Sequence, residues 1–364
     1  MKKTEKVLVI VTAVAILCSV LAVYLMVRFG SAVEKPYDYD LSEYIDLGNW
    51  QAVEAVYDDE TVCTEEEIDD ALFQVCLTWA DFTPVEGRRV QQYDQVTVDY
   101  YCFIEGEPDD SLTQTGYDII CGLKNGSLFD EAIGEALVAQ APAAGDTVYA
   151  DTAYPNEASY GGFAGCRVDI EIHVQKVSDH SIPECTDEFV RDVNGSETMT
   201  VAEFREDIRK SILEEKADLK AQKVWAAFYD QVTVKKYPEK EEAAYVAALR
   251  EDFETDAENA GMTLDGYLQE LGTDRATFEN DILEQAHILL KQEMTFFQLA
   301  RLEEVSLTEE EYQAGIRAYF ESDPGEFSSL EAFEEEYGKE VLMQNLTWDR
   351  AIDILIANAV RVEG

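Results

Sequence analysis

Basic residues and histidines are scarce in this sequence. Its 364 residues include 28 lysines and arginines against 76 aspartates and glutamates, and only three histidines, which gives a formal net charge of −48. A surface this negative repels phosphate backbones, so nucleic acid is a poor partner. We interpret most of the acidity as solvated helix faces that keep the protein soluble.

The motifs of several enzyme and metal-site classes are absent too. The sequence contains no Gly-x-Ser-x-Gly, no His-Glu-x-x-His, no glycine-rich phosphate loop and no Cys-x-x-Cys. His173, His180 and His287 share no ligand spacing, and an acidic pair such as Asp109-Asp110 carries little information among so many carboxylates. We therefore expect neither a cofactor nor a metal ion.

Apolar residues, in contrast, are plentiful, and one long apolar segment without a charge runs from Val7 to Val27. As a helix of about 21 residues it measures roughly 31 Å, which matches the ~30 Å hydrocarbon core of a bilayer. Three lysines precede it and few basic residues follow, which predicts a cytoplasmic N-terminus and an extracytoplasmic remainder. We expect a single-pass anchor in the cell membrane within residues 1–30. A cleaved signal peptide is the alternative, although its apolar region is usually only about 7–15 residues long.

Seven cysteines are present, and Cys18 lies within the apolar segment. An oxidising compartment would permit disulfide bonds among the other six. Free thiols that pack as small apolar groups are equally compatible with the sequence. The six are Cys63, Cys76, Cys102, Cys121, Cys166 and Cys185.

The rest of the chain changes from polar to mixed and then to helical patterns. Residues 31–49 are polar and indicate a linker, and Thr64 with the acids behind it predicts a helix start. Period-two alternation between residues 94 and 180 predicts a small antiparallel sheet around one short helix, at about 129–138. The candidate strands lie at about 96–101, 117–121, 146–149 and 168–174.

From residue 181 onward the pattern is helical, so the fold class is α+β with an N-terminal transmembrane helix. Wide apolar stripes, such as the one with Phe296, Phe297, Leu299 and Leu302, indicate buried core, and an open groove is the alternative. The predicted helices span about 200–234, 238–260, 263–271, 273–304, 308–322, 328–337 and 339–360.

A series of short motifs over about residues 50–363 resembles trigger factor. Residues 79–100 are similar to the start of that family's FKBP-type isomerase domain, and residues 126–137 and 154–165 to segments within it. Residues 182–189 resemble the junction to its C-terminal domain, and residues 204–210 and 235–240 resemble parts of that domain. The shared order and spacing over some 300 residues carries the resemblance.

The resemblance implies an FKBP-like domain at 94–180, a leading segment with a helix at 50–93 and an all-α chaperone domain at 181–364. It also implies a pocket in which a prolyl isomerase takes the X–Pro bond out of water. Asp109 stands where the family has an aromatic residue, and Ala158 where a loop tyrosine is usual, although Tyr160 is close by. The implied pocket residues are Tyr100, Phe129, Ile133, Ile170 and Tyr160.

The family's N-terminal ribosome-docking domain, with its Gly-Phe-Arg signature, has no counterpart here, so we do not expect ribosome binding. The implied partners are unfolded or proline-containing polypeptides, and the membrane through the helix at 7–27. The leading hypothesis combines chaperone and prolyl isomerase activity. The alternatives are a holdase whose FKBP-like domain is inactive and a cell-surface scaffold. A parvulin-type foldase fits the order of strands and helix less well.

Overall fold

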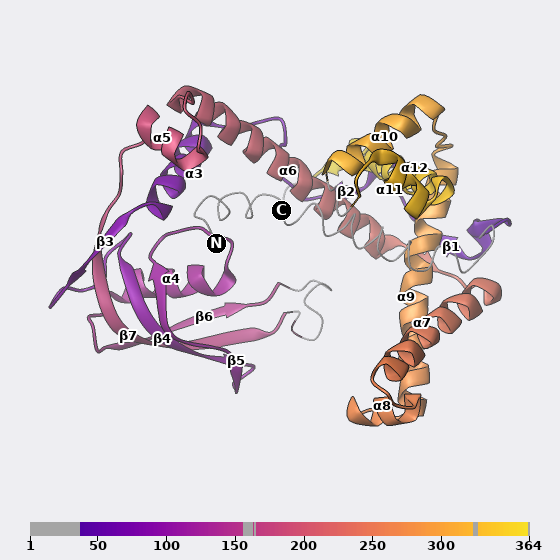
Figure 1. The fold of residues 1–364 in the computed structure, drawn as a ribbon, viewed down its shortest axis with the longest axis horizontal. Coiled ribbons are helices and arrows are strands. Elements are labelled where there is room, and N and C mark those ends of the chain that lie inside the picture. The colour runs from indigo at the N-terminus through magenta and orange to yellow at the C-terminus, as the bar shows by residue number, and fades with distance from the viewer. Residues whose placement is uncertain (1–36, 156–162, 164, 323–326, 363–364) are drawn as a thin grey trace. The chain divides into compact units, whose positions relative to one another are not determined.

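The computed structural model describes residues 37–155, 163, 165–322 and 327–362 (Figure 1). They form two compact units, which we call unit 1 (Thr61–Leu213) and unit 2 (residues 37–60 and 214–362). The predicted anchor at residues 7–27 lies outside the described residues. Over the part that is described, no helix combines the length and apolar composition that crossing a bilayer requires.

Unit 1 is built around a five-stranded antiparallel sheet in the order β3-β7-β4-β5, with β6 also paired to β7. Helix α4 lies against one face of this sheet, as Figure 1 shows. The predicted arrangement of an antiparallel sheet around one short helix is therefore confirmed. The elements of unit 1 are α3 (Glu65–Thr78), β3 (Asp81–Val85), β4 (Gln95–Ile104), β5 (Glu107–Ile120), α4 (Leu128–Gln140), β6 (Thr147–Ala153), β7 (Arg167–Ser181), α5 (Asp187–Asn194) and the first part of α6 (Val201–Gln231).

Local sequence explains where the helices of unit 1 begin. Thr64 and Glu67 form a reciprocal capping box at the start of α3, and the Ser127 side chain accepts a hydrogen bond from the Asp130 N–H at the start of α4. The sheet is larger than its alternation predicts. Strand β5 extends over polar residues because β4 pairs with it, and β3 is a short edge strand that contains Pro84.

Unit 2 is mainly helical, and its helices begin and end within a few residues of the predicted bounds. In Figure 1, α7 and α8 lie along the first part of α9. The elements are η1 (Leu41–Glu43), β1 (Ile45–Asp46), η2 (Trp50–Ala52), β2 (Glu54–Ala55), the rest of α6, β8 (Thr233–Val234), α7 (Glu239–Asn259), α8 (Leu264–Glu270), α9 (Arg275–Leu302), α10 (Glu309–Ser322), α11 (Leu330–Tyr337), α12 (Lys339–Ala357) and β9 (Val360–Arg361).

The described part of the predicted linker is not a solvated spacer. Tyr37, Leu41, Ile45 and Leu47 are at most 3% exposed and belong to the core of unit 2. Strand β1 pairs with β8, and β2 pairs in parallel with β9 near the end of the chain. Tyr37, Leu41 and Ile45 are four residues apart, as on a helix, but the segment forms only a short 3-10 turn and a two-residue strand. Only tertiary contacts therefore reveal that these residues are buried.

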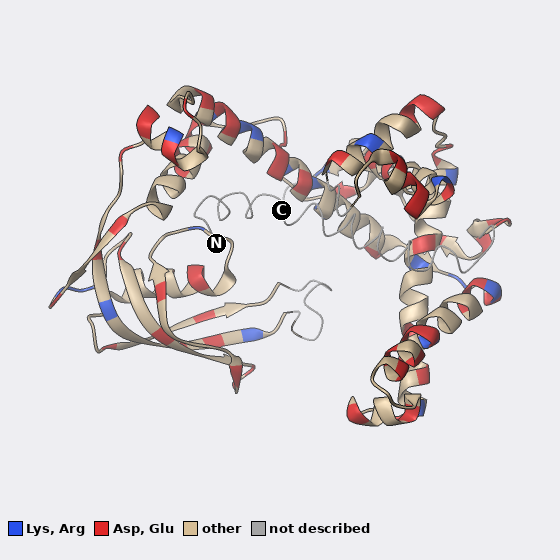
Figure 2. Cartoon of the chain, viewed as in Figure 1, with Lys and Arg blue, Asp and Glu red and all other residues tan. Residues whose placement is uncertain are grey.

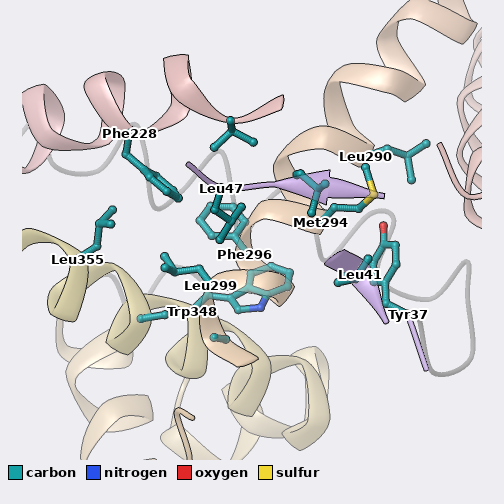
Figure 3. Packing of buried hydrophobic residues seen from close by; sticks show 14 of the residues in the cluster. Tyr37, Leu41, Leu47, Phe228, Leu290, Met294, Phe296, Leu299, Trp348 and Leu355 are labelled. Atoms are coloured by element: carbon teal, nitrogen blue, oxygen red, sulfur yellow. The ribbon is translucent and has the colours of Figure 1, made fainter. Parts of the chain in front are cut away.

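The core of unit 2 contains a stack of three aromatic rings, two of which, Phe296 and Trp348, are labelled in Figure 3. Phe296 lies between Trp225 and Trp348, with ring centroids 5.1 and 5.0 Å away and nearly parallel planes. Leu299 is fully buried beside them, whereas Leu302 is 41% exposed. The stripe on α9 is thus mainly core, as predicted, with one exposed residue at its end.

Candidate functional site

Four of the five predicted pocket residues lie together between α4 and the sheet of unit 1. Tyr100, Ile133 and Ile170 are 6%, 0% and 1% exposed, and all three belong to one hydrophobic core. Phe129, in the first turn of α4, packs against this core and is partly buried. The fifth residue, Tyr160, lies outside the described residues.

Strand register places Asp109 in the same row as two residues of this hydrophobic core, Cys102 and Ile170. Cys102 on β4 pairs with Asp109 on β5 and with Ile170 on β7, and Ile170 pairs with Ala150 on β6. Residues directly opposite one another in neighbouring strands share a face of the sheet. Since Cys102 and Ile170 are buried beneath α4, Asp109 stands at the end of a row on the helix-covered face.

The Asp109 carboxylate is held in its charged form. It accepts hydrogen bonds from the Ser111 hydroxyl at 2.5 Å and the Ser111 N–H at 2.9 Å, and these bonds keep the pKa of Asp109 below its usual range. Burial, followed by the nearby Asp109 charge, raises the pKa of the Cys102 thiol to about 11. A charge at the end of this row retains water, which opposes desolvation of a bound amide.

Aromatic side chains that the sequence analysis did not assign to the pocket contact its predicted members. The Tyr154 and Phe129 rings meet edge to face with their centroids 6.0 Å apart, and the Phe163 and Tyr154 ring centroids are 5.6 Å apart. Tyr117 meets Tyr100 edge to face at 5.9 Å. Tyr117 could have been found from its position two residues before the buried Ile119 on the same strand, which gives both the same face.

A separate groove of about 410 Å³ lies between α4 and β6. Three carboxylates line it, from Glu131, Glu135 and Asp151, together with small alanine side chains. None of the four predicted pocket residues that the structure describes lines this groove. Its acidic walls suit a cationic side chain better than an apolar proline ring.

Asp94, Asp179 and His180 come within ligand distance of one another elsewhere in unit 1. The Arg88 guanidinium already bonds both carboxylates, at 2.8 Å to Asp94 and 3.1 Å to Asp179. The fully buried Asp94 also accepts the Gln91 N–H at 2.8 Å. We interpret the group as an ion-pair network in which arginine supplies the positive charge.

Unit 2 exposes large apolar side chains along its helices and at their ends. Ile288 on α9 is 56% exposed, although the next residue, Leu289, is buried. Figure 2 shows acidic residues over most of the helices of this unit. Helix α9 also carries acids, and Glu284 lies four residues before the exposed Ile288. The exposed leucines and isoleucine of unit 2 are Leu219, Leu271, Leu283, Ile288 and Leu302.

Comparison with known proteins gives one family match and a set of relatives. Residues 200–357 match the family described as bacterial trigger factor protein (TF) C-terminus. The trigger factor of Acetivibrio thermocellus is 27% identical over 320 residues, which cover 86% of this chain and 72% of that protein. The trigger factor of Caldicellulosiruptor bescii is 25% identical over 332 residues, with 89% and 74% covered.

Among solved structures, a chain from a study titled "Promiscuous Substrate Recognition in Folding and Assembly Activities of the Trigger Factor Chaperone" is 18% identical, with a TM-score of 0.38. The alignment covers 86% of this chain and 72% of that chain. On the family match and the curated relatives, this chain is similar to trigger factors over most of its length.

Proposed function

We propose that this protein is a folding factor that binds unfolded polypeptide through the helices of unit 2. The observation that carries the proposal is the set of large apolar side chains left exposed there, with Ile288 and Leu271 each more than half exposed. An unfolded chain also exposes apolar side chains, so contact removes both surfaces from water and is favourable. Similarity to trigger factors over most of the chain supports the same function.

The acidic surface complements this role. A net charge of −48 keeps copies of the protein apart even when they carry apolar clients. It also favours clients in which basic residues flank an apolar segment. The test is an aggregation assay with a reduced, unfolded client and the full-length protein in detergent. Delayed light scattering at a stoichiometric amount is expected, and an unchanged aggregation rate would contradict polypeptide binding.

The second proposed activity is cis/trans isomerisation of X–Pro bonds at the pocket of unit 1. Rotation about a peptide bond has a barrier of ~18–20 kcal/mol. An apolar pocket favours the twisted amide, because twisting removes the resonance that makes the planar amide polar. The edge-to-face contact between Phe129 and Tyr154 beside the buried Tyr100 and Ile170 supports this activity. In this proposal Tyr160 contributes to the same pocket.

A holdase with an inactive pocket remains the alternative, and Asp109 is the observation that favours it. Its charged carboxylate occupies the end of the row formed by Cys102 and Ile170. A proline-limited refolding assay and a tetrapeptide assay distinguish the two functions. If the pocket is active, Phe129→Ala slows both reactions while aggregation suppression is retained. If wild type and Phe129→Ala give equal rates, the protein is a holdase.

We further propose that the segment at residues 7–27 anchors the protein, with units 1 and 2 outside the cytoplasm. The support is the length of the apolar segment and the lysines before it. Protease added to intact cells is then expected to degrade epitopes in both units. Crosslinking in cells should capture exported chains. Capture of ribosomal proteins without exported chains would contradict this location.

A further inference from the structure

Two cysteines distant in sequence flank the end of the β3–β7 ladder in unit 1. The ladder places Asp81 opposite Ser181. Cys76 lies five residues before Asp81, near the end of α3, and Cys185 lies four residues after Ser181. Antiparallel register therefore carries the two cysteines toward each other. Beyond the ladder, the Trp79 and Phe189 rings meet edge to face at 6.4 Å, which holds the same two segments together.

The two thiols lie close enough for each to shift the pKa of the other. Cys76 is only 5% exposed, whereas Cys185 is partly exposed. The cysteines at positions 102 and 121 lie in the core of the sheet instead. Cys63 is the nearest competitor, since its side chain and that of Cys185 pack against the same small core, but its sulfur contacts the Thr64 carbonyl oxygen at 3.8 Å.

We propose that Cys76 and Cys185 form a disulfide bond that joins the chain entering the sheet to the chain leaving it. The co-reactant is a small disulfide such as oxidised glutathione, or a protein of the thiol–disulfide oxidoreductase class. The Cys76 and Cys185 sulfurs are oxidised to one disulfide bond, and the external disulfide is reduced to two thiols. The two thiol protons end on the two departing thiolates, so atoms and electrons balance.

The difference in exposure sets the order of the two steps. Cys185 is the more exposed thiol; burial raises its pKa, and the neighbouring Cys76 thiol lowers it in part. Burial raises the pKa of Cys76 to about 11. Cys185 therefore attacks the external disulfide first and releases one thiolate. Cys76 then attacks the Cys185 sulfur of the mixed disulfide and releases the second thiolate.

This bond would link the two ends of the segment between α3 and α5, so that the segment becomes a closed loop. A cross-link over about 110 residues restricts the unfolded chain strongly and so stabilises the folded state. It would also fix the two strands that connect the sheet with its flanking helices, and thus limit movement of the sheet within unit 1. The inference needs only the two thiols and an oxidant, and it holds whether or not the pocket is active.

Peptide mapping of the full-length protein in detergent tests the proposal. The protein is equilibrated with excess oxidised glutathione, quenched in acid, alkylated and digested. We expect a linked peptide that contains Cys76 and Cys185 and that dithiothreitol separates. The Cys63→Ser variant should give the same linked peptide, whereas Cys185→Ser should give none.

Two results would overturn the proposal, and neither depends on a variant that folds. One is recovery of both cysteines fully alkylated, or blocked separately by glutathione, from oxidised wild-type protein. The other is a linked peptide that joins Cys185 to Cys63 rather than to Cys76.

Discussion

Replacement of Ile288 by serine is the sharpest test of polypeptide binding by unit 2. Ile288 keeps 56% of its surface exposed in the middle of α9, with Leu289 and Leu290 buried next to it. An apolar client segment that binds here covers the exposed part of the side chain. Serine removes most of that apolar surface and leaves the buried neighbours in place.

The expected loss of affinity follows from the exposed fraction. Full burial of an isoleucine side chain contributes ~1.5–3 kcal/mol. Since about half of Ile288 is available to a client, the substitution should cost about 0.8–1.5 kcal/mol of binding free energy. Every ~1.4 kcal/mol is tenfold in the dissociation constant, so Kd should rise roughly 4- to 12-fold.

The assay is a fluorescence anisotropy titration of a labelled, unfolded client peptide with full-length protein in detergent. Gln285→Ser is the matched control, because Gln285 is also exposed on α9 and its replacement removes little apolar surface. Thermal unfolding should show that both variants keep the wild-type stability within about 0.5 kcal/mol, as is usual for exposed positions. Equal Kd values for Ile288→Ser and Gln285→Ser would refute binding at this surface.

Three further predictions concern the pocket and the core. Asp109→Leu should speed tetrapeptide isomerisation several-fold relative to wild type, because it removes the charge from the row with Cys102; an unchanged rate would show that Asp109 does not limit the pocket. Burial raises the pKa of Glu293, whose carboxyl accepts a hydrogen bond from the Tyr37 hydroxyl at 2.5 Å. The contribution of Glu293 to stability is therefore full below pH ~4 and declines as the pH rises through the raised pKa. Glu293→Gln should therefore gain stability relative to wild type between pH 4 and 8 in urea titrations, and a constant difference would contradict this assignment. Phe296→Ala removes the central ring of the aromatic stack and should cost ~3–5 kcal/mol in the same titrations, whereas a loss under 1 kcal/mol would show that the stack is not an essential part of the core.

The helices of unit 2 could be predicted because their signals are local. Thr263, Asp274 and Ser329 each accept a backbone N–H in the first turn of a helix, and Gly272 and Gly338 lie where helices end. A capping residue and the helix it caps are only a few positions apart, so a short stretch of sequence is enough to predict these contacts. The same holds for the capping box of α3.

The extent of the sheet could not be read in the same way. Residues 109–116 of β5 are mostly polar and exposed, and they form a strand because β4 offers them an unpaired edge. Similarly, Tyr37 and Leu41 are buried because α9 and its neighbours provide an apolar surface for them. In both cases the partner lies far away in the sequence, and the segment itself carries no period that identifies it.

The sequence by itself determined the helical and alternating segments, the acidity and the motifs that resemble trigger factor. These depend on residue type and on spacing within one or two turns. Tertiary structure alone decided that Asp109 shares a row with Ile170, that Cys76 and Cys185 lie beyond the same end of the β3–β7 ladder, and that Ile288 is exposed whereas Leu289 is buried. The physical reason is that strand register and helix packing depend on free energies summed over partners that are distant in sequence. Of two neighbouring apolar residues, one can therefore be buried while the other stays exposed.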